Sequence, residues 1–165
     1  MVVNIGGGTT EVAVISLGGI VTWSSLRVAG NRFDHSIADF IRKKYGLAIG
    51  ETTAENIKIH VGTALPNRNK LEMKIRGRDL PSGLPRDLVI SSNEVAEAVN
   101  PHLSDIMGSV QSVFNVTPPE LAADMMEKGI VLSGGRSQLR DIQEFFRRSL
   151  GVSAYVAEDA ILCVA

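Results

Sequence analysis

The chain has 165 residues, 44% of them hydrophobic and 21% charged, and its 17 basic residues nearly balance its 18 acidic ones. This is the composition of a globular domain with its own core, and the charge balance argues against a nucleic-acid-binding protein. A single cysteine, Cys163, excludes an internal disulfide framework and is expected to be a small buried thiol. No apolar run reaches the about 20 residues of a membrane-spanning helix, so we expect a cytosolic chain without a transmembrane segment.

Apolar patterning predicts three strands and a helix at the start of the chain. A short buried strand over residues 2–5 is followed by an alternating strand over 12–17. The Gly-Gly pair that comes next is typical of a tight hairpin, which predicts a third strand over 20–28. Apolar residues then recur at helical spacing, and the helix is expected to end at Tyr45 and Gly46.

A helix and a hairpin are expected next. Thr52 and Glu55 have the spacing of a capping box, which predicts a helix closed by Pro66. Residues 70–90 contain alternating apolar and charged positions with turn residues between them, and they predict a small hairpin with one face in water.

A long helix follows a second capping-box pattern at Ser91 and Glu94. Its apolar face extends to Val113, and Pro101 inside it is expected to kink or split the helix. Thr117 is expected to cap a further short helix with proline at its first position.

The last part of the chain is predicted to contain strand, helix and strand. Residues 129–133 are an apolar run bounded by glycines, as in a buried strand. The sequence "GGR" leads from it into a helix through 139–150, and a final strand is expected over 154–157.

Isolated titratable residues suggest no further chemistry. His35, His60 and His102 lack the spacing of metal ligands, and Asp34 and Asp39 are expected to face water. No nucleophile and base can be paired, so neither a catalytic residue nor a protein metal site is predicted.

Two glycine-rich stretches are the strongest functional signal. "NIGGGTT" and "VLSGGRS" each follow a strand, where glycines let backbone N–H groups approach an anion such as phosphate. Neither stretch matches the P-loop or the Rossmann pattern, and a plain tight turn explains either one alone. The functional hypothesis requires both turns to open into one shared hollow.

The order of elements and several stretches resemble the MreB family of rod-shape-determining bacterial actins, in the actin, Hsp70 and sugar-kinase superfamily. The most specific stretches are "IGGGTTEVAVISLGGIV", "RGRDLPSGLPR", "TPPELAAD", "GIVLSGG" and "YVAEDAILCVA". The resemblance implies an α/β, actin-like ATPase (ribonuclease H-like) half with a mixed sheet and flanking helices. It also implies a core subdomain over 1–50 and 91–165 and a smaller inserted α/β subdomain over 51–90. Only the C-terminal half of the family is expected here, with both ends cut.

The resemblance also implies a cofactor, ATP with Mg²⁺, and a set of contacts. The matching positions are Gly6, Gly7, Gly8 and Thr9 for the second phosphate turn, Glu55, Asn56, Ile57 and Lys58 for the helix at the adenosine end, and Gly134, Gly135, Arg136 and Ser137 for the adenosine loop. From the residues alone, Glu55 and Lys58 are equally an i,i+3 ion pair worth about 0.2 to 0.5 kcal/mol.

Two positions depart from the family pattern. Asn4 stands where the family has an aspartate that helps to hold Mg²⁺, so metal binding is expected to weaken. Arg136 stands where the family has a third glycine. If that backbone has positive φ, arginine costs about 1 kcal/mol, and its side chain either obstructs the pocket or pairs with a phosphate.

The resemblance implies head-to-tail self-association into filaments and partners among the cell-shape and wall-synthesis proteins at the inner membrane. The expected location is cytoplasmic and membrane-associated, and a half chain is not expected to hydrolyse ATP alone. The rival hypothesis is a truncated, non-enzymatic fragment with lost or weakened nucleotide binding that keeps a protein-interaction surface.

Overall fold

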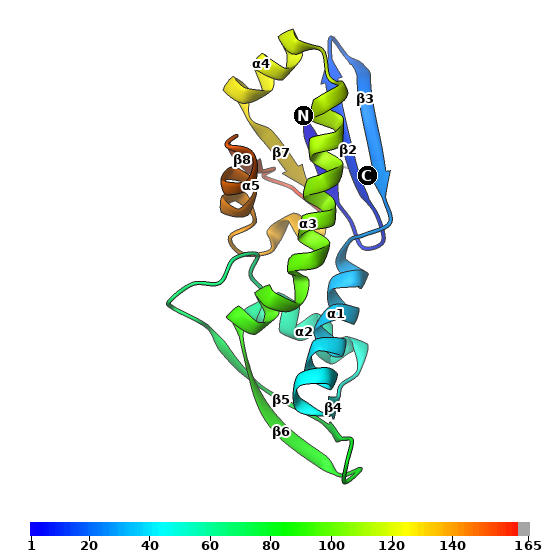
Figure 1. The fold of residues 1–165 in the computed structure, drawn as a ribbon, viewed down its shortest axis with the longest axis vertical. Coiled ribbons are helices and arrows are strands. Elements are labelled where there is room, and N and C mark those ends of the chain that lie inside the picture. The colour runs from blue at the N-terminus through cyan, green and yellow to red at the C-terminus, as the bar shows by residue number, and fades with distance from the viewer. Residues whose placement is uncertain (162–165) are drawn as a thin grey trace.

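The computed structural model describes residues 1–161, so the expectation for Cys163 lies outside the described residues. The chain forms an elongated α/β structure with two sheets (Figure 1). The larger, mixed sheet has the strand order β3-β2-β1-β7-β8 and the smaller sheet the order β4-β5-β6. The predicted fold class is therefore confirmed.

The larger sheet contains both antiparallel and parallel pairs. Its strands are β1 (Val2–Ile5), β2 (Thr10–Ser16), β3 (Gly19–Leu26), β7 (Ile130–Ser133) and β8 (Ala154–Val156). The first three are antiparallel, whereas β7 is parallel to β1 and β8 is parallel to β7. The hairpin predicted before β3 is present, but its turn residues are Leu17 and Gly18, both with the positive φ that such a tight turn requires, and not the Gly-Gly pair, because Gly19 already belongs to β3.

Helices join the two sheets into one structure. The helical elements are α1 (Gly30–Tyr45), α2 (Glu51–Val61), α3 (Ser92–Val116), α4 (Pro119–Lys128), η1 (Gly135–Gln138) and α5 (Ile142–Leu150). Helix α3 extends along the long axis across β2 and β3, and α1 packs against both α3 and α2 (Figure 1). A single apolar cluster runs through these contacts, with Phe33, Leu103 and Phe146 almost fully buried.

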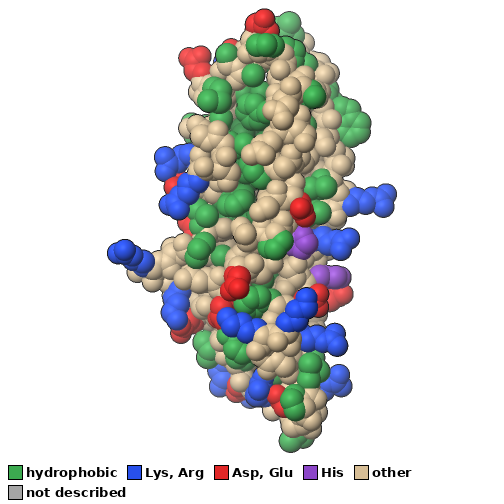
Figure 2. Space-filling model, viewed as in Figure 1, with side chains coloured by type: hydrophobic (Ala, Val, Ile, Leu, Met, Phe, Trp, Pro, Cys, Tyr) green, Lys and Arg blue, Asp and Glu red, His purple; other side chains and the backbone are tan. Residues whose placement is uncertain are grey.

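The smaller sheet contains the predicted hairpin. It consists of β4 (Leu47–Ala48), β5 (Glu72–Asp79) and β6 (Pro85–Ser91), all antiparallel. Ile75 and Ile90 are buried, whereas Lys74 and Arg76 on either side of Ile75 are exposed, and Figure 2 shows side chains of both charges crowded over this end of the molecule. Strand β4 was not predicted, and it lies before the expected boundary at residue 50. The domain boundaries themselves stay a prediction.

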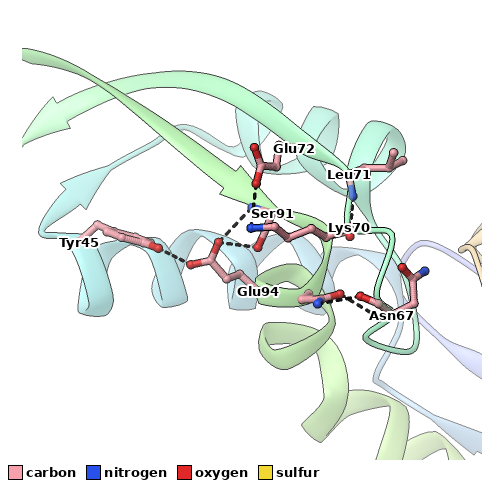
Figure 3. A network of polar contacts seen from close by, with 9 residues as sticks. Tyr45, Asn67, Lys70, Leu71, Glu72, Ser91 and Glu94 are labelled. Carbon is pink, nitrogen blue, oxygen red and sulfur yellow. Dashed lines mark hydrogen bonds and ion pairs between the residues drawn. The ribbon is translucent and has the colours of Figure 1, made fainter.

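Some predicted helix ends are confirmed. Gly46 has a φ of 62° and donates its N–H to the Arg42 carbonyl, which ends α1 as predicted. Ser91 and Glu94 form the expected capping box of α3 (Figure 3). The helix continues through Pro101 as a single element, so the predicted split is wrong.

Other helix ends differ from the prediction. Helix α2 begins after Gly50 and ends at Val61, so neither the capping box at Thr52 nor closure by Pro66 is present. The capping box fails because Thr52 already lies inside the first turn of the helix.

Thr117 belongs to the preceding helix rather than to the following one. Its hydroxyl donates to the Val113 carbonyl at the end of α3, and Pro118 is the residue before α4, with Pro119 at the first helical position. The helix expected from 139 begins only at Ile142: residues 135–138 form a 3₁₀ turn, and Asp141 has a φ of 59°, which lies outside the right-handed helical region.

Candidate functional site

The first glycine turn, residues 6–9, connects β1 to β2 and is supported by the N-terminus of α1. The N–H groups of Gly30 and Asn31 donate to two carbonyl oxygens of the turn, at 3.2 and 2.8 Å. Among the described residues, none of the N–H groups of residues 7–9 donates to another backbone group. Three adjacent donors therefore remain available to an anion.

Positive φ is not the reason for this glycine run. None of Gly6, Gly7 and Gly8 has a φ in the left-handed region. A Cβ on Gly6 would lie 3.2 Å from the Thr9 carbonyl oxygen, whereas one on Gly8 would meet no atom within 4 Å. The missing side chains of Gly7 and Gly8 instead leave the N–H groups of the turn accessible.

The second glycine turn follows β7 and lies beside the first. Strands β1 and β7 are parallel and pair Asn4 with Ser133, so their carboxyl ends meet at the same edge of the sheet. Gly134 has a φ of 85°, and a Cβ there would lie 2.4 Å from the Ile5 carbonyl oxygen. Only glycine fits this close approach. Arg136 does not have positive φ, so the expected backbone strain at that residue is absent.

Both turns line one cavity of about 470 Å³. Gly6 and Gly7 of the first turn, Gly135 and Arg136 of the second, and Lys58 of α2 line it. The exposed side chains of Ile59 and Ile161 form an apolar part of its wall. The expectation that the two glycine turns open into a common hollow is therefore confirmed.

A buried ion pair supports the α2 side of the cavity. The Lys58 ammonium lies 2.6 Å from one carboxylate oxygen of Asp34, and both residues are less than a tenth exposed. The prediction that Asp34 faces water is therefore wrong. Lys58 is paired with Asp34 and not with Glu55. Burial lowers the pKa of Lys58 below its usual range, the Asp34 carboxylate opposes this, and the Arg136 charge adds to the lowering.

Glu55 is paired across the site instead. Arg136 Nη2 lies 3.0 Å from Glu55 Oε1, which connects the second glycine turn to α2. The stem of the arginine covers Gly30, where a Cβ would come 2.1 Å from Arg136 Nε. The arginine therefore lies inside the site rather than in solvent.

Asn4 is bonded within the sheet. Its Nδ2 donates to Glu11 Oε2 at 2.8 Å, and the two residues are cross-strand neighbours. Within residues 1–161 no group of three His, Cys, Asp or Glu side chains is placed to hold a metal ion. The open N–H groups of the first turn fit an anion, whereas the position beside Glu11 holds a neutral amide, which is a poor ligand for Mg²⁺.

The predicted site residues are not all in the cavity. Five line it, namely Gly6, Gly7, Lys58, Gly135 and Arg136, and seven do not, namely Gly8, Thr9, Glu55, Asn56, Ile57, Gly134 and Ser137. Ile57 and Ser137 are fully buried, and Asn56 is exposed. Which of them touches a ligand stays a prediction.

Sequence reasoning missed the counter-ion of Lys58, which is Asp34, and seven residues that line the cavity. The seven are Phe33, Ile59, Gly62, Gln138, Leu139, Arg140 and Ile161. A signal was present for Asp34, because Lys58 lies next to Ile57 on the buried face of α2 and a buried ammonium requires a partner.

A second cavity of about 520 Å³ lies between α5 and β8. Of the predicted site residues only Ser137 borders it. Although it is larger, it holds neither free turn N–H groups nor the α2 ion pair, so the cavity at the glycine turns is the better candidate.

Comparison with known proteins identifies the relatives of this chain. The MreB/Mbl protein family matches residues 1–165. The cell shape-determining protein MreB of Escherichia coli (strain K12) is 47% identical over 165 residues, which is 100% of this chain and 48% of that protein. The chain thus spans about half the length of the relatives it matches.

Solved structures agree with this relationship. The crystal structure of MreB5 of Spiroplasma citri bound to ADP has a TM-score of 0.96 and 41% identity, and the match covers 99% of this chain and 50% of that one. A MamK double helical filament has a TM-score of 0.78 at 22% identity, with 98% and 50% coverage, and supports the fold alone. The two-sheet architecture is therefore that of an actin-like half.

Proposed function

The chain belongs to the MreB/Mbl family, and we propose that it is the nucleotide-binding C-terminal half of a cell shape-determining bacterial actin. The observation that carries this proposal is the single cavity lined by both glycine turns and by Lys58 of α2. Nothing about a whole protein is needed for this step, because all three elements lie within the chain.

The proposed ligand is an adenine nucleotide. The related MreB5 is bound to ADP, and the open N–H groups of residues 7–9 suit its phosphates. The base and sugar would lie between α2 and η1, against Ile59 and Ile161, once Arg136 is displaced from Glu55. Mg²⁺ would be held mainly by the phosphates, because Asn4 offers no charge and is bonded to Glu11.

Hydrolysis is not part of the proposal. The chain supplies one wall of a cleft, and among its described residues no nucleophile or base lines the cavity apart from Lys58, which is paired with Asp34. We expect ATP binding without turnover by this chain alone.

Self-association belongs to the same proposal. Family membership supports head-to-tail filaments and partners among the cell-shape and wall-synthesis proteins at the inner membrane. The described part of the chain has no helix long and apolar enough to cross a bilayer.

A second candidate is a non-enzymatic fragment that keeps a protein-interaction surface. Two observations favour it: Asn4 is engaged by Glu11, and Arg136 is engaged by Glu55 inside the cavity. Both contacts oppose nucleotide binding, while the core around them is closely packed.

A titration of fluorescent ATP with Mg²⁺ separates these candidates. We expect weak binding by the chain and tighter binding by the double variant Asn4→Asp, Arg136→Gly. Equal affinities would contradict the inhibitory roles of the two residues. Absence of binding by both chains would contradict the nucleotide site and favour the fragment.

A further inference from the structure

The Arg136 side chain crosses the site from the second glycine turn to α2. It is anchored at the far end by Glu55, with 3.0 Å between Nη2 and Oε1, and at its stem by contact with Gly30. Only 23% of the Arg136 side chain is exposed, against 45% of that of Glu55. The guanidinium is thus held inside the groove and is not a mobile surface group.

Two cavities lie beside the helix pair α1 and α2. Arg136 and Lys58 line the cavity of about 470 Å³, whereas Glu55 and Asp34 line a polar cavity of about 350 Å³. Each of the two ion pairs therefore has one member in each cavity. The ion pair of Arg136 and Glu55 connects η1 to α2 with one member lining each cavity, and we call this pair the partition.

The partition leaves the anion-binding end free. Gly6 and Gly7 line the larger cavity, and the hydrogen bond of the guanidinium is directed to Glu55 and not to the turn. A phosphate chain therefore meets the open N–H group of Gly7, next to those of Gly8 and Thr9 in the same turn, but a ribose and base between η1 and α2 meet an arginine that is already paired.

We propose that Arg136 determines the ligand specificity of this site: while it is paired with Glu55, the site accepts polyphosphate anions and excludes the nucleoside attached to them. This inference rests on the proposed nucleotide site and adds which part of the nucleotide is recognised. Removal of the side chain joins the two cavities and admits the nucleoside.

The test compares pyrophosphate with ADP by isothermal titration calorimetry on three chains: the parent, Arg136→Ala and Arg140→Gln. Arg140 lines the same cavity but donates to the backbone carbonyls of Gly62 and His60, so its variant controls for the loss of one positive charge. The readout is the ratio of the two affinities. The loss of one positive charge weakens the binding of both ligands, so this effect cancels in the ratio.

The parent is expected to bind ADP within about twofold of pyrophosphate, and Arg140→Gln to keep that ratio. Arg136→Ala is expected to bind ADP at least about tenfold more tightly than pyrophosphate, because the nucleoside then contributes its own contacts. Arg136→Gly, tested in parallel with a check of folding by circular dichroism, gives the same result if the side chain and not the backbone is responsible.

Two kinds of failure are distinguishable. A tenfold preference for ADP in the parent, or an unchanged ratio in Arg136→Ala, overturns the role of Arg136 while the anion site stands. Absence of binding of either ligand to any of the chains overturns the nucleotide site itself and the role of Arg136 with it.

Discussion

Lys58 and Asp34 are joined by a buried ion pair that fixes α2 against α1, with 2.6 Å between the ammonium and a carboxylate oxygen. The two residues are 24 positions apart, and both are nearly inaccessible to water. Since Lys58 also lines the cavity, the pair couples the stability of the fold to the shape of the site.

Asp34→Asn is expected to destabilise the chain by about 3 kcal/mol, because it leaves the Lys58 ammonium buried without a counter-ion. Urea unfolding followed by circular dichroism measures the loss. Asp39→Asn on the exposed side of the same helix is the control and is expected to change stability by less than about 0.5 kcal/mol. Equal effects of both variants would show that the pair contributes nothing specific.

Glu94 is expected to make stability dependent on acid pH. Its carboxylate accepts hydrogen bonds from Tyr45 and Ser91 (Figure 3) and from Lys44, and its side chain is 17% exposed. Burial would raise its pKa, but these three donors outweigh burial and lower the pKa to about 2. A carboxylate with a lowered pKa stabilises the fold above its unfolded pKa of 4.5, and that contribution is lost as the pH falls toward 2.

Glu94→Gln removes this contribution. At pH 6 it is expected to be less stable than the parent by up to about 3 kcal/mol, and the difference should shrink below pH 4.5 and disappear only below about pH 2. Urea midpoints of both chains across this range measure it, with Glu97→Gln, on the exposed side of α3, as control. A difference that is independent of pH would contradict the assignment.

Substitution by alanine should cost much more stability at Gly134 than at Gly8. Gly134→Ala places a Cβ on a residue with positive φ and against the Ile5 carbonyl oxygen. We therefore expect the free energy of unfolding to fall by at least about 2 kcal/mol. Gly8→Ala meets no atom within 4 Å and is expected to cost less than about 1 kcal/mol. Thermal unfolding measures both. Comparable losses would mean that the first turn is more tightly constrained than its surroundings indicate.

An apolar row crosses all five strands of the larger sheet. The register pairs Trp23 with Ala13, Ala13 with Val2, Val2 with Val131 and Val131 with Tyr155. Trp23 is 67% exposed and is the only tryptophan in the sequence. At low concentration its fluorescence should resemble that of tryptophan in water and be quenched by iodide. A blue-shifted emission shielded from iodide would show that this face is covered.

Much of the fold follows from local sequence signals. The hairpin between β2 and β3, the glycine end of α1 and the alternation in β5 each depend on neighbouring residues, and the structure contains all three, with the hairpin turn one residue earlier than predicted. Strand β4 was not predicted because two residues are too few to show an alternation of apolar and polar side chains. Its pairing with β5 also depends on residues about 30 positions away.

The site was less predictable than the fold. The glycine turns were found because their residue type is unusual, but the partner of Arg136 is 81 positions distant and the pairing is visible only in three dimensions. Thr117 shows the same limit at a helix end, since a threonine between two helices can bond to either one, and only packing decides.

Amide NMR of the chain titrated with ADP tests the central claim most directly, namely that the two glycine turns form one anion-binding cavity. The account predicts the largest shifts at residues 6–9 and 134–137, with changes along α2 that become larger in Arg136→Ala. Shifts gathered instead between α5 and β8, or no shifts at millimolar ADP in either chain, would contradict it.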